Sequence, residues 1–218
     1  MRAIDVMVRD VVTVHADTDM AEAIRLLSEH DVSALPVVDA DGRLIGIISE
    51  ADLLHRVELG TEKRRPWWLE AVTGASTLAH DFAKSHGKKV GELMTPEVIS
   101  VGEETPVSEI AALLERKRIK RVPITRDGKL VGIVSRSNLI QALASALGHG
   151  ANTRDQDLDI REELLARLQG QSWTDFGSRN IIVSGGAVHL WGLISSESER
   201  EALIALAEGC AGRRERRG

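Results

Sequence analysis

The sequence predicts an α+β protein made of two copies of one β-α-β-β-α unit, followed by a small α/β domain. Three observations support this prediction. The chain contains an ordered internal repeat in which Met7 aligns with Met94 and Pro36 with Pro123. Each copy carries a glycine turn between two apolar segments, at Gly42 and at Gly128. A helix, hairpin and helix pattern then fills the last part of the chain.

The first copy starts with a short apolar segment, 11–14, which we expect to be a strand. Asp17 and Thr18 are residue types that cap helices, and a helical apolar spacing follows them. The residues of that spacing are Ala21, Ile24 and Leu27. We therefore predict a helix after Thr18, with these three side chains on its buried face.

Two apolar strands, LPVVD and LIGIIS, follow this helix and are joined by the Asp41-Gly42 turn. Ser49 then provides a cap for a second helix that begins near Glu50. The second copy repeats this order with a one-residue deletion after Arg126. One copy cannot bury both faces of so small a sheet, so the duplication predicts a pseudo-twofold pair with two equivalent clefts.

Composition excludes several classes of function. Net charge is -5 and the pI is about 5.8, which argues against a general affinity for nucleic acid. The single cysteine, Cys210, allows no intramolecular disulfide and fits a reducing compartment. The first residues are charged at Arg2 and Asp5, and no apolar run reaches the roughly 20 residues of a membrane span. We expect a cytoplasmic protein.

The segments VSALPVVD, DGRLIGIIS and SEADLL, which occur twice in variant form, resemble the CBS domain family, named after cystathionine β-synthase. The resemblance covers about residues 6–145, apart from an insert between the repeats. It implies a disc-like module that binds adenosyl ligands between paired repeats and regulates an attached or partner protein. The ligands that it implies are AMP, ADP, ATP, NAD(H) or S-adenosylmethionine. It also implies a homodimer.

The same residues fit this ligand chemically. Ser49 and Asp52 bring a hydroxyl and a carboxylate to one helix start, where an acid can accept hydrogen bonds from the two ribose hydroxyls. Adenine needs an apolar slot, which the chain at 33–35 and at 120–122 provides. Lys120 and Arg121 add positive charge for phosphates. A helix cap alone is the competing explanation for the Ser49 and Asp52 spacing.

Carrying the family's pattern over residue by residue gives two clefts. The favoured cleft contains Ile47, Ser49, Asp52, Met94, Ile99, Ile119, Lys120 and Arg121. The weaker cleft contains Met7, Val12, Val32, Ser33, Ala34, Ile133, Ser135 and Asn138. Asn138 stands where the family pattern has an acid, and an uncharged amide holds a diol less well. We therefore expect Asp52 to mark the working site and the Asn138 cleft to be weak or empty.

The insert and the C-terminal region leave alternatives open. Trp67 and Trp68, beside basic residues, indicate a dimer contact or a core lid, with membrane contact as the alternative. The motif VSGGAVHLWGLISSESER resembles the BON domain, a small α/β module of bacteria that is linked to phospholipid or partner binding. The arginine-rich tail after Ala207 replaces the final apolar strand expected in that family. A frameshift and an interaction tail both explain it.

The predicted domains are a CBS pair at 1–147, a linker at 148–154 and a BON-like domain at 155–218. Within the pair, repeat one covers about 6–57, the insert about 58–90 and repeat two about 91–146. No catalytic motif or metal-ligand spacing stands out, so we expect a non-enzymatic nucleotide sensor with a protein partner that the sequence does not identify. The alternatives are a ligand-free structural or stress-associated interaction protein and a peripheral membrane binder. No specific nucleic acid partner is expected.

Overall fold

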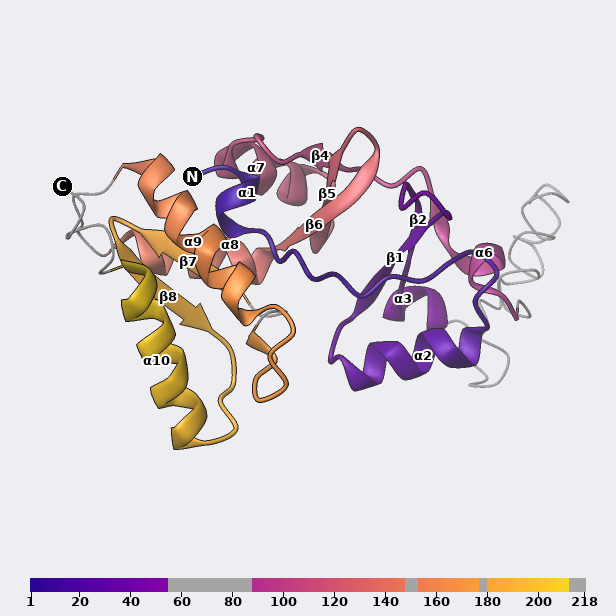
Figure 1. Cartoon of the computed structure of the whole chain (residues 1–218). Coiled ribbons are helices and arrows are strands. Elements are labelled where there is room, and N and C mark those ends of the chain that lie inside the picture. The colour runs from indigo at the N-terminus through magenta and orange to yellow at the C-terminus, as the bar shows by residue number, and fades with distance from the viewer. Residues whose placement is uncertain (55–87, 148–152, 177–179, 212–218) are drawn as a thin grey trace, which may run out of the picture. The chain divides into compact units, whose positions relative to one another are not determined.

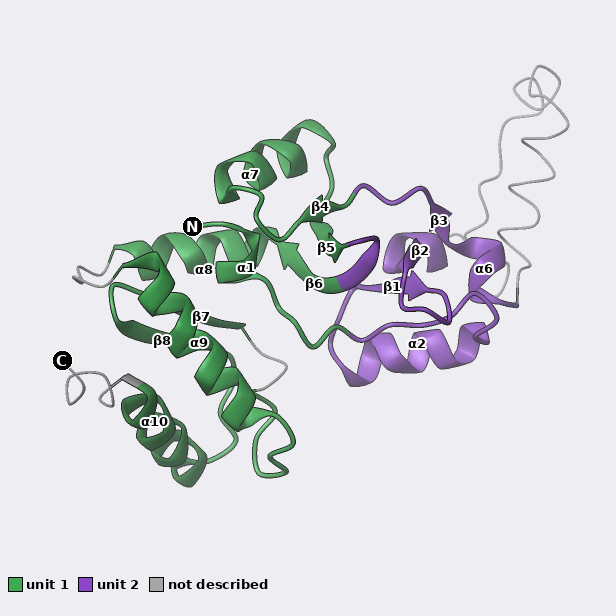
Figure 2. Cartoon of the chain, turned by 45° about the horizontal axis from the view of Figure 1, so that its top comes forward, with its two compact units in different colours: residues 1–11, 100–126, 131–218 green, residues 12–99, 127–130 purple. Residues whose placement is uncertain are grey.

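The computed structural model describes all residues except 55–87, 148–152, 177–179 and 212–218 (Figure 1). The helices predicted in the insert, Trp67 and Trp68, and the arginine-rich end of the tail lie outside the described residues. The described chain forms two compact units (Figure 2). Unit 1 contains residues 1–11, 100–126 and 131–218, and unit 2 contains residues 12–99 and 127–130.

Unit 2 holds most of the first repeat around a three-stranded antiparallel sheet. Its order is β1 (Ala34–Val38), β2 (Leu44–Ser49) and β3 (Thr95–Pro96). The register pairs Ala34 with Ser49, so the end of β2 lies beside the start of β1. The helices of this unit are α2 (Met20–Glu29), α3 (Glu50–Leu53) and α6 (Val90–Leu93).

The predicted turn and strands of the first repeat are present. Gly42 has a φ of 77°, a conformation that glycine adopts without strain, and Asp39 accepts hydrogen bonds from the backbone N–H groups of Asp41 and Arg43. The two apolar strands on either side of this turn are β1 and β2.

Two local predictions for the first repeat were wrong, and a third was right only in part. Residues 11–14 form no strand, since only Val14 makes an isolated parallel bridge with Val37, while the N–H of Val11 donates to the Arg9 carbonyl. Helix α2 starts later than predicted, with Asp19 as its N-cap. Of the residues named for the helical spacing, Leu27 is buried, whereas Ala21 and Ile24 are exposed, and the other buried residues of α2 are Met20 and Ala23.

Unit 1 combines the N-terminal segment, most of the second repeat and the C-terminal domain. Its first part contains α1 (Ala3–Val6), α7 (Val107–Arg116), α8 (Arg136–Ala146) and a sheet of order β4-β5-β6. The strands of that sheet are β4 (Val101–Gly102), β5 (Arg121–Arg126) and β6 (Lys129–Ser135), and β4 pairs with β5 in parallel.

The C-terminal domain consists of two helices and one hairpin. These are α9 (Arg154–Leu168), β7 (Asn180–Ser184), β8 (Ala187–Trp191) and α10 (Glu197–Ala211). Gly185 and Gly186 form the predicted turn with positive φ, and Asp157 on α9 accepts a 2.7 Å hydrogen bond from each of their N–H groups. The core of this domain contains four apolar residues of α9, which are Ile160, Leu164, Leu165 and Leu168.

The segment that begins each repeat in the sequence packs in the unit that holds most of the other repeat. Val8, at the start of repeat one, forms an antiparallel bridge with Ile133 in β6 of unit 1. Thr95, at the start of repeat two, pairs with Ile47 in β2 of unit 2. This exchange explains why residues 1–11 belong to unit 1 and residues 90–99 to unit 2. The same exchange brings residues from both repeats together within each unit.

Candidate functional site

The favoured acid, Asp52, lies at the start of α3 directly after β2. The backbone N–H and the hydroxyl of Ser49 each donate a 2.9 Å hydrogen bond to Asp52 Oδ2. Both bonds use the same oxygen, which leaves Oδ1 without a hydrogen bond to any described residue. Asp52 is half-buried, as is Ser49. The arrangement holds a carboxylate in place while one of its oxygens stays available to accept from a ligand hydroxyl.

Met94 joins this group from the second repeat. Its sulfur lies so close to Gly46 in β2 that a Cβ at Gly46 would collide with it. Met94 also packs against the core of unit 2, which contains Ile48 and Leu93. The structure thus brings Met94 together with the strand that carries Ile47 and leads into Ser49 and Asp52. Ile99, further along the same unit, is exposed.

The other residues predicted for this cleft lie in unit 1. Ile119 packs against the core of that unit, and its N–H donates to the Leu114 carbonyl. Lys120 is exposed, and its carbonyl accepts a hydrogen bond from the N–H of Arg136 at the start of α8. Arg121 is half-buried at the start of β5. The residues predicted for this cleft therefore belong partly to unit 1 and partly to unit 2.

The weaker cleft is divided in the same way. Its unit 1 half is Met7, Ile133, Ser135 and Asn138, and its unit 2 half is Val12, Val32, Ser33 and Ala34. Met7 is buried, with its sulfur 2.6 Å from the position a Cβ would take at Gly132, so it matches Met94 on Gly46. Val12 and Val32 pack against the core of unit 2. The Ser33 carbonyl accepts from the N–H of Glu50, which places Ser33 and Ala34 beside the start of α3.

Asn138 repeats the cap geometry of Asp52 but uses its remaining atoms differently. Its Oδ1 accepts hydrogen bonds of 2.7 Å from both the N–H and the hydroxyl of Ser135. Its Nδ2 donates a 3.3 Å hydrogen bond to Gln141 Oε1, which also accepts a 2.6 Å bond from Nδ2 of Asn180 in β7. Asn138 is only 7% exposed. Its amide is thus engaged on both sides by the protein.

The structure also shows a functional candidate that the sequence reasoning missed. Arg161, on α9, is 2% exposed and lies within the apolar stripe of Leu164 and Leu168. A charged residue inside an apolar stripe is the signal that could have identified it. Burial, together with the nearby charge of Arg9, lowers the pKa of Arg161 to about 10, so the side chain stays protonated at neutral pH.

Other kinds of site are not found in the described ranges. They contain no helix that is long and apolar enough to cross a bilayer, and no cluster of three or more potential metal ligands. A hollow of about 590 Å³ lies beside Arg9, Glu162 and the C-terminal end of α9. None of the residues predicted to bind an adenosyl ligand is among the described residues that line it.

Comparison with known proteins identifies both parts of the chain. The CBS domain family model matches residues 3–59 and 90–145, and the BON domain model matches residues 156–215. The chain is 33% identical over 150 residues to the uncharacterized protein MJ1426 of Methanocaldococcus jannaschii, covering 64% of this chain and 89% of that protein. It is also 33% identical over 139 residues to the chloroplastic CBS domain-containing protein CBSX1 of Arabidopsis thaliana. That match covers 61% of this chain and about three fifths, 59%, of CBSX1.

A solved structure agrees with these matches. The crystal structure of CBSX2 in complex with AMP superposes with a TM-score of 0.58 and 32% identity. The superposition covers 66% of this chain and 96% of the CBSX2 chain in that crystal structure. The two CBS matches, the structural likeness and the C-terminal match agree with the resemblances stated from the sequence. The protein therefore belongs to the CBS domain family, as a tandem CBS pair followed by a BON domain.

Proposed function

We propose that this protein is a regulatory module that senses an adenine nucleotide through the cleft containing Asp52. The observation that carries the proposal is the Asp52 carboxylate, which is held by Ser49 through Oδ2 while Oδ1 makes no hydrogen bond to a described residue. A ribose diol needs an acceptor of this kind. The likeness to CBSX2, whose structure contains AMP, supports an adenosyl ligand.

The remaining predicted residues supply the rest of the recognition. Ile47, Met94, Ile99 and Ile119 provide apolar surface for adenine, and Lys120 and Arg121 provide positive charge for phosphate. A hydrogen bond to a charged group contributes roughly 1.5–3 kcal/mol, whereas micromolar affinity needs about 8 kcal/mol. Several modest contacts must therefore act together. AMP, ADP, ATP, NADH and S-adenosylmethionine are the candidate ligands.

The regulatory output follows from differential binding. A ligand changes what a protein contacts only if it binds two states with different affinity. We propose that occupation of the Asp52 cleft favours one state of the CBS pair, and that the C-terminal domain passes this state to a protein partner. The chain works in this scheme as a homodimer and performs no catalysis.

A thermal-shift screen with the five candidate ligands, followed by titration calorimetry, tests this function. Asp52→Ala should weaken nucleotide binding tenfold or more, because it removes the ribose acceptor. Glu50→Ala is the matched control, since Glu50 is an exposed acid in the same helical turn and is not part of the proposed site. Equal affinity of the wild type and Asp52→Ala would refute the assignment of this cleft. No shift with any ligand would leave the interaction-protein alternative.

A further inference from the structure

The hairpin of the C-terminal domain is buried on both faces. In β7, Ile181 and Val183 belong to the core of the C-terminal domain, whereas Ile182 belongs to the core of the second repeat. Trp191 in β8 lies opposite Asn180 and packs against the same second-repeat core. Side chains alternate along a strand, so the two cores lie on opposite faces of the β7–β8 hairpin. We call the face that carries Asn180, Ile182 and Trp191 the docking face.

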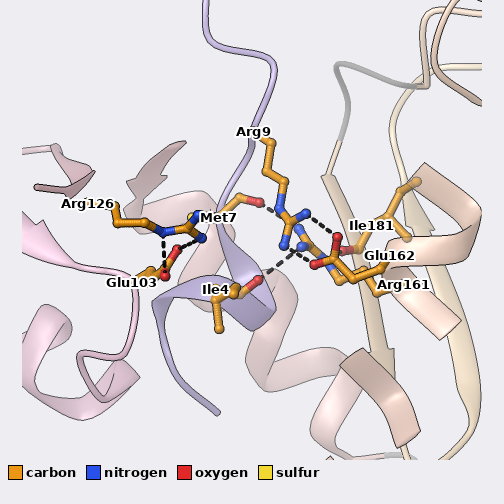
Figure 3. A network of polar contacts seen from close by, with 8 residues as sticks. All are labelled: Ile4, Met7, Arg9, Glu103, Arg126, Arg161, Glu162 and Ile181. Atoms are coloured by element: carbon orange, nitrogen blue, oxygen red, sulfur yellow. Dashed lines mark hydrogen bonds and ion pairs between the residues drawn. The ribbon is translucent and has the colours of Figure 1, made fainter. Parts of the chain in front are cut away.

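Arg161 connects three separate parts of the chain next to this hairpin. Its Nε donates a 2.6 Å hydrogen bond to the carbonyl of Ile181 in β7. Its Nη1 donates to the Ile4 carbonyl at 2.9 Å, and its Nη2 donates to the Met7 carbonyl at 2.6 Å (Figure 3). One buried guanidinium thus satisfies carbonyls from the hairpin and from both ends of the α1 segment. This geometry needs the planar fork of arginine, since an ammonium group cannot span three such acceptors.

Two ion pairs near Arg161 also connect the N-terminal segment to α9. Arg9 of the N-terminal segment forms a two-pronged ion pair with Glu162 on α9 (Figure 3). Arg154, at the start of α9, donates to the carboxylate of Asp5 at 2.9 Å. These pairs are partly exposed, so they add orientation more than free energy.

The docking face also contacts the cap of α8. Asn180 donates to Gln141 Oε1, and Asn138 donates to the same oxygen, so the three amides form one chain of hydrogen bonds. Trp191 adds a 3.3 Å bond from its indole Nε1 to the hydroxyl of Ser145 on α8. The amide chain through Gln141 connects Asn138 to β7 of the C-terminal domain. Asn138 is the residue that aligns with Asp52, the proposed ribose-binding acid.

We propose that the C-terminal domain is an integral layer of the second repeat, held by Arg161, and that Asn138 is a docking residue for this domain and not a ribose-binding residue. The second statement rests on the proposed function, whereas the first does not. Three observations support the first statement independently of the proposed function. They are the burial of the docking face, the three carbonyl acceptors of Arg161 and the chain of amide hydrogen bonds. A change in the second repeat is therefore transmitted directly to α9 and β7.

Hydrogen exchange of the full chain without nucleotide tests this docking. In Arg161→Met, exchange of residues 3–8 and 180–191 should accelerate together at least tenfold, because the carbonyls lose their shared donor. Residues 20–29 and 34–49 of unit 2 should keep their protection. Arg167→Met is the matched control, since Arg167 lies on the same helix and, among the described residues, forms its ion pair with the partly exposed Glu163.

A second pair of variants keeps the test decisive if Arg161→Met does not fold. Gln141→Leu has a similar volume but no acceptor, so exchange in 180–191 should accelerate. Gln141→Glu keeps an acceptor for both Asn138 and Asn180, so protection should stay within about twofold of the wild type. Equal exchange in both Gln141 variants, or an Arg161→Met protein in which 3–8 remain fully protected, would overturn the proposal. Because no nucleotide is added, failure here is distinct from failure to bind one.

Discussion

The two repeats begin their second helices with the same cap but different chemistry. Ser49 donates twice to one oxygen of Asp52, and Ser135 donates twice to one oxygen of Asn138. The remaining atom is an acceptor oxygen at Asp52 and a donor nitrogen at Asn138, where it binds Gln141. The comparison shows that the two caps share one local fold, while a single atom, an oxygen at Asp52 and a nitrogen at Asn138, differs in the hydrogen bonds that it can make.

The cores of the two repeats also differ in whether they include residues of the C-terminal domain. The described core around Leu35 and Ile48 consists of residues from unit 2 alone. The core around Ile124 and Val134 also includes Ile182 from the C-terminal domain. The second repeat therefore depends on the C-terminal domain for part of its packing, whereas no described residue of that domain enters the first core.

The largest expected effect comes from breaking this shared core. Ile182→Ala should lower the free energy of unfolding by about 2–5 kcal/mol, because it removes buried methyl groups and leaves a cavity. Urea unfolding followed by circular dichroism measures the loss. Ile204→Ala on α10 is the control, since Ile204 is 39% exposed and should cost far less. Similar losses in both variants would contradict the shared core.

The methionine contacts of the two repeats give a second test. A Cβ at Gly132 would lie 2.6 Å from Met7 Sδ and 2.9 Å from the Val8 carbonyl oxygen, while Arg161 holds the Met7 carbonyl. A Cβ at Gly46 would meet the Met94 sulfur, but the nearest backbone atom, the Thr95 oxygen, is 3.3 Å away. Gly132→Ala should therefore cost about 1–3 kcal/mol, and more than Gly46→Ala.

Thermal unfolding of the two glycine variants, measured in parallel, checks this order. The expected result is a lower Tm for Gly132→Ala than for Gly46→Ala, because the flexible end of Met94 can move away whereas the backbone of Val8 cannot. The reverse order would show that the Arg161 contact does not restrain the segment at Met7.

Exchange of the two cap residues addresses binding directly. Asp52→Asn should weaken AMP binding at least tenfold, or by about 1.4 kcal/mol, because an amide offers a single acceptor oxygen and that oxygen is engaged by Ser49. Asn138→Asp should add no second binding site, because this position is buried and faces Gln141. Titration calorimetry reports both affinity and stoichiometry. Two sites per chain in Asn138→Asp would show that the amide alone kept that cleft empty.

Much of this organisation could be predicted from the sequence because it repeats. The ordered matches, such as Met7 with Met94, predicted the duplication, and the Gly42 turn and the serine caps are local signals. The absence of a strand at 11–14 could not be predicted, because a strand forms only where a neighbouring strand supplies hydrogen-bond partners. In the structure only Val14 makes such a bridge, with Val37. The buried face of α2 was predicted correctly only at Leu27, because the side chains that a helix buries depend on the elements against which it packs.

The docking contacts could not be predicted because they depend on tertiary packing. Hydrogen bonds from Arg161 reach residues that lie 154 and 157 positions earlier in the sequence. No local sequence pattern specifies such distant partners. The apolar run 181–183 in β7 does not indicate that alternate side chains enter two different cores. The departure of Asn138 from the family pattern was visible in the sequence, but its partner Gln141 was not identified.

An acidic residue near the start of α10, in the C-terminal domain, extends the comparison of carboxylate and amide to the effect of pH. Glu199 accepts 2.7 Å hydrogen bonds from the hydroxyl of Thr174 and from the N–H of Ser195. These bonds, that from Thr174 first, lower the pKa of Glu199 below its ordinary value of 4.5. A carboxyl group with a lowered folded pKa stabilises the protein above its unfolded pKa, and this contribution is lost as the pH falls through the folded pKa.

Glu199→Gln should therefore be less stable than the wild type near neutral pH, because an uncharged amide is a weaker acceptor for both donors. The difference in Tm should shrink as the pH falls from neutral to below 4.5, since the wild-type carboxylate becomes protonated as the pH passes through its lowered pKa. Thermal unfolding across that range measures it, with Glu201→Gln at an exposed neighbouring position as the control. A Tm difference that is constant with pH would mean that charge at this position contributes nothing.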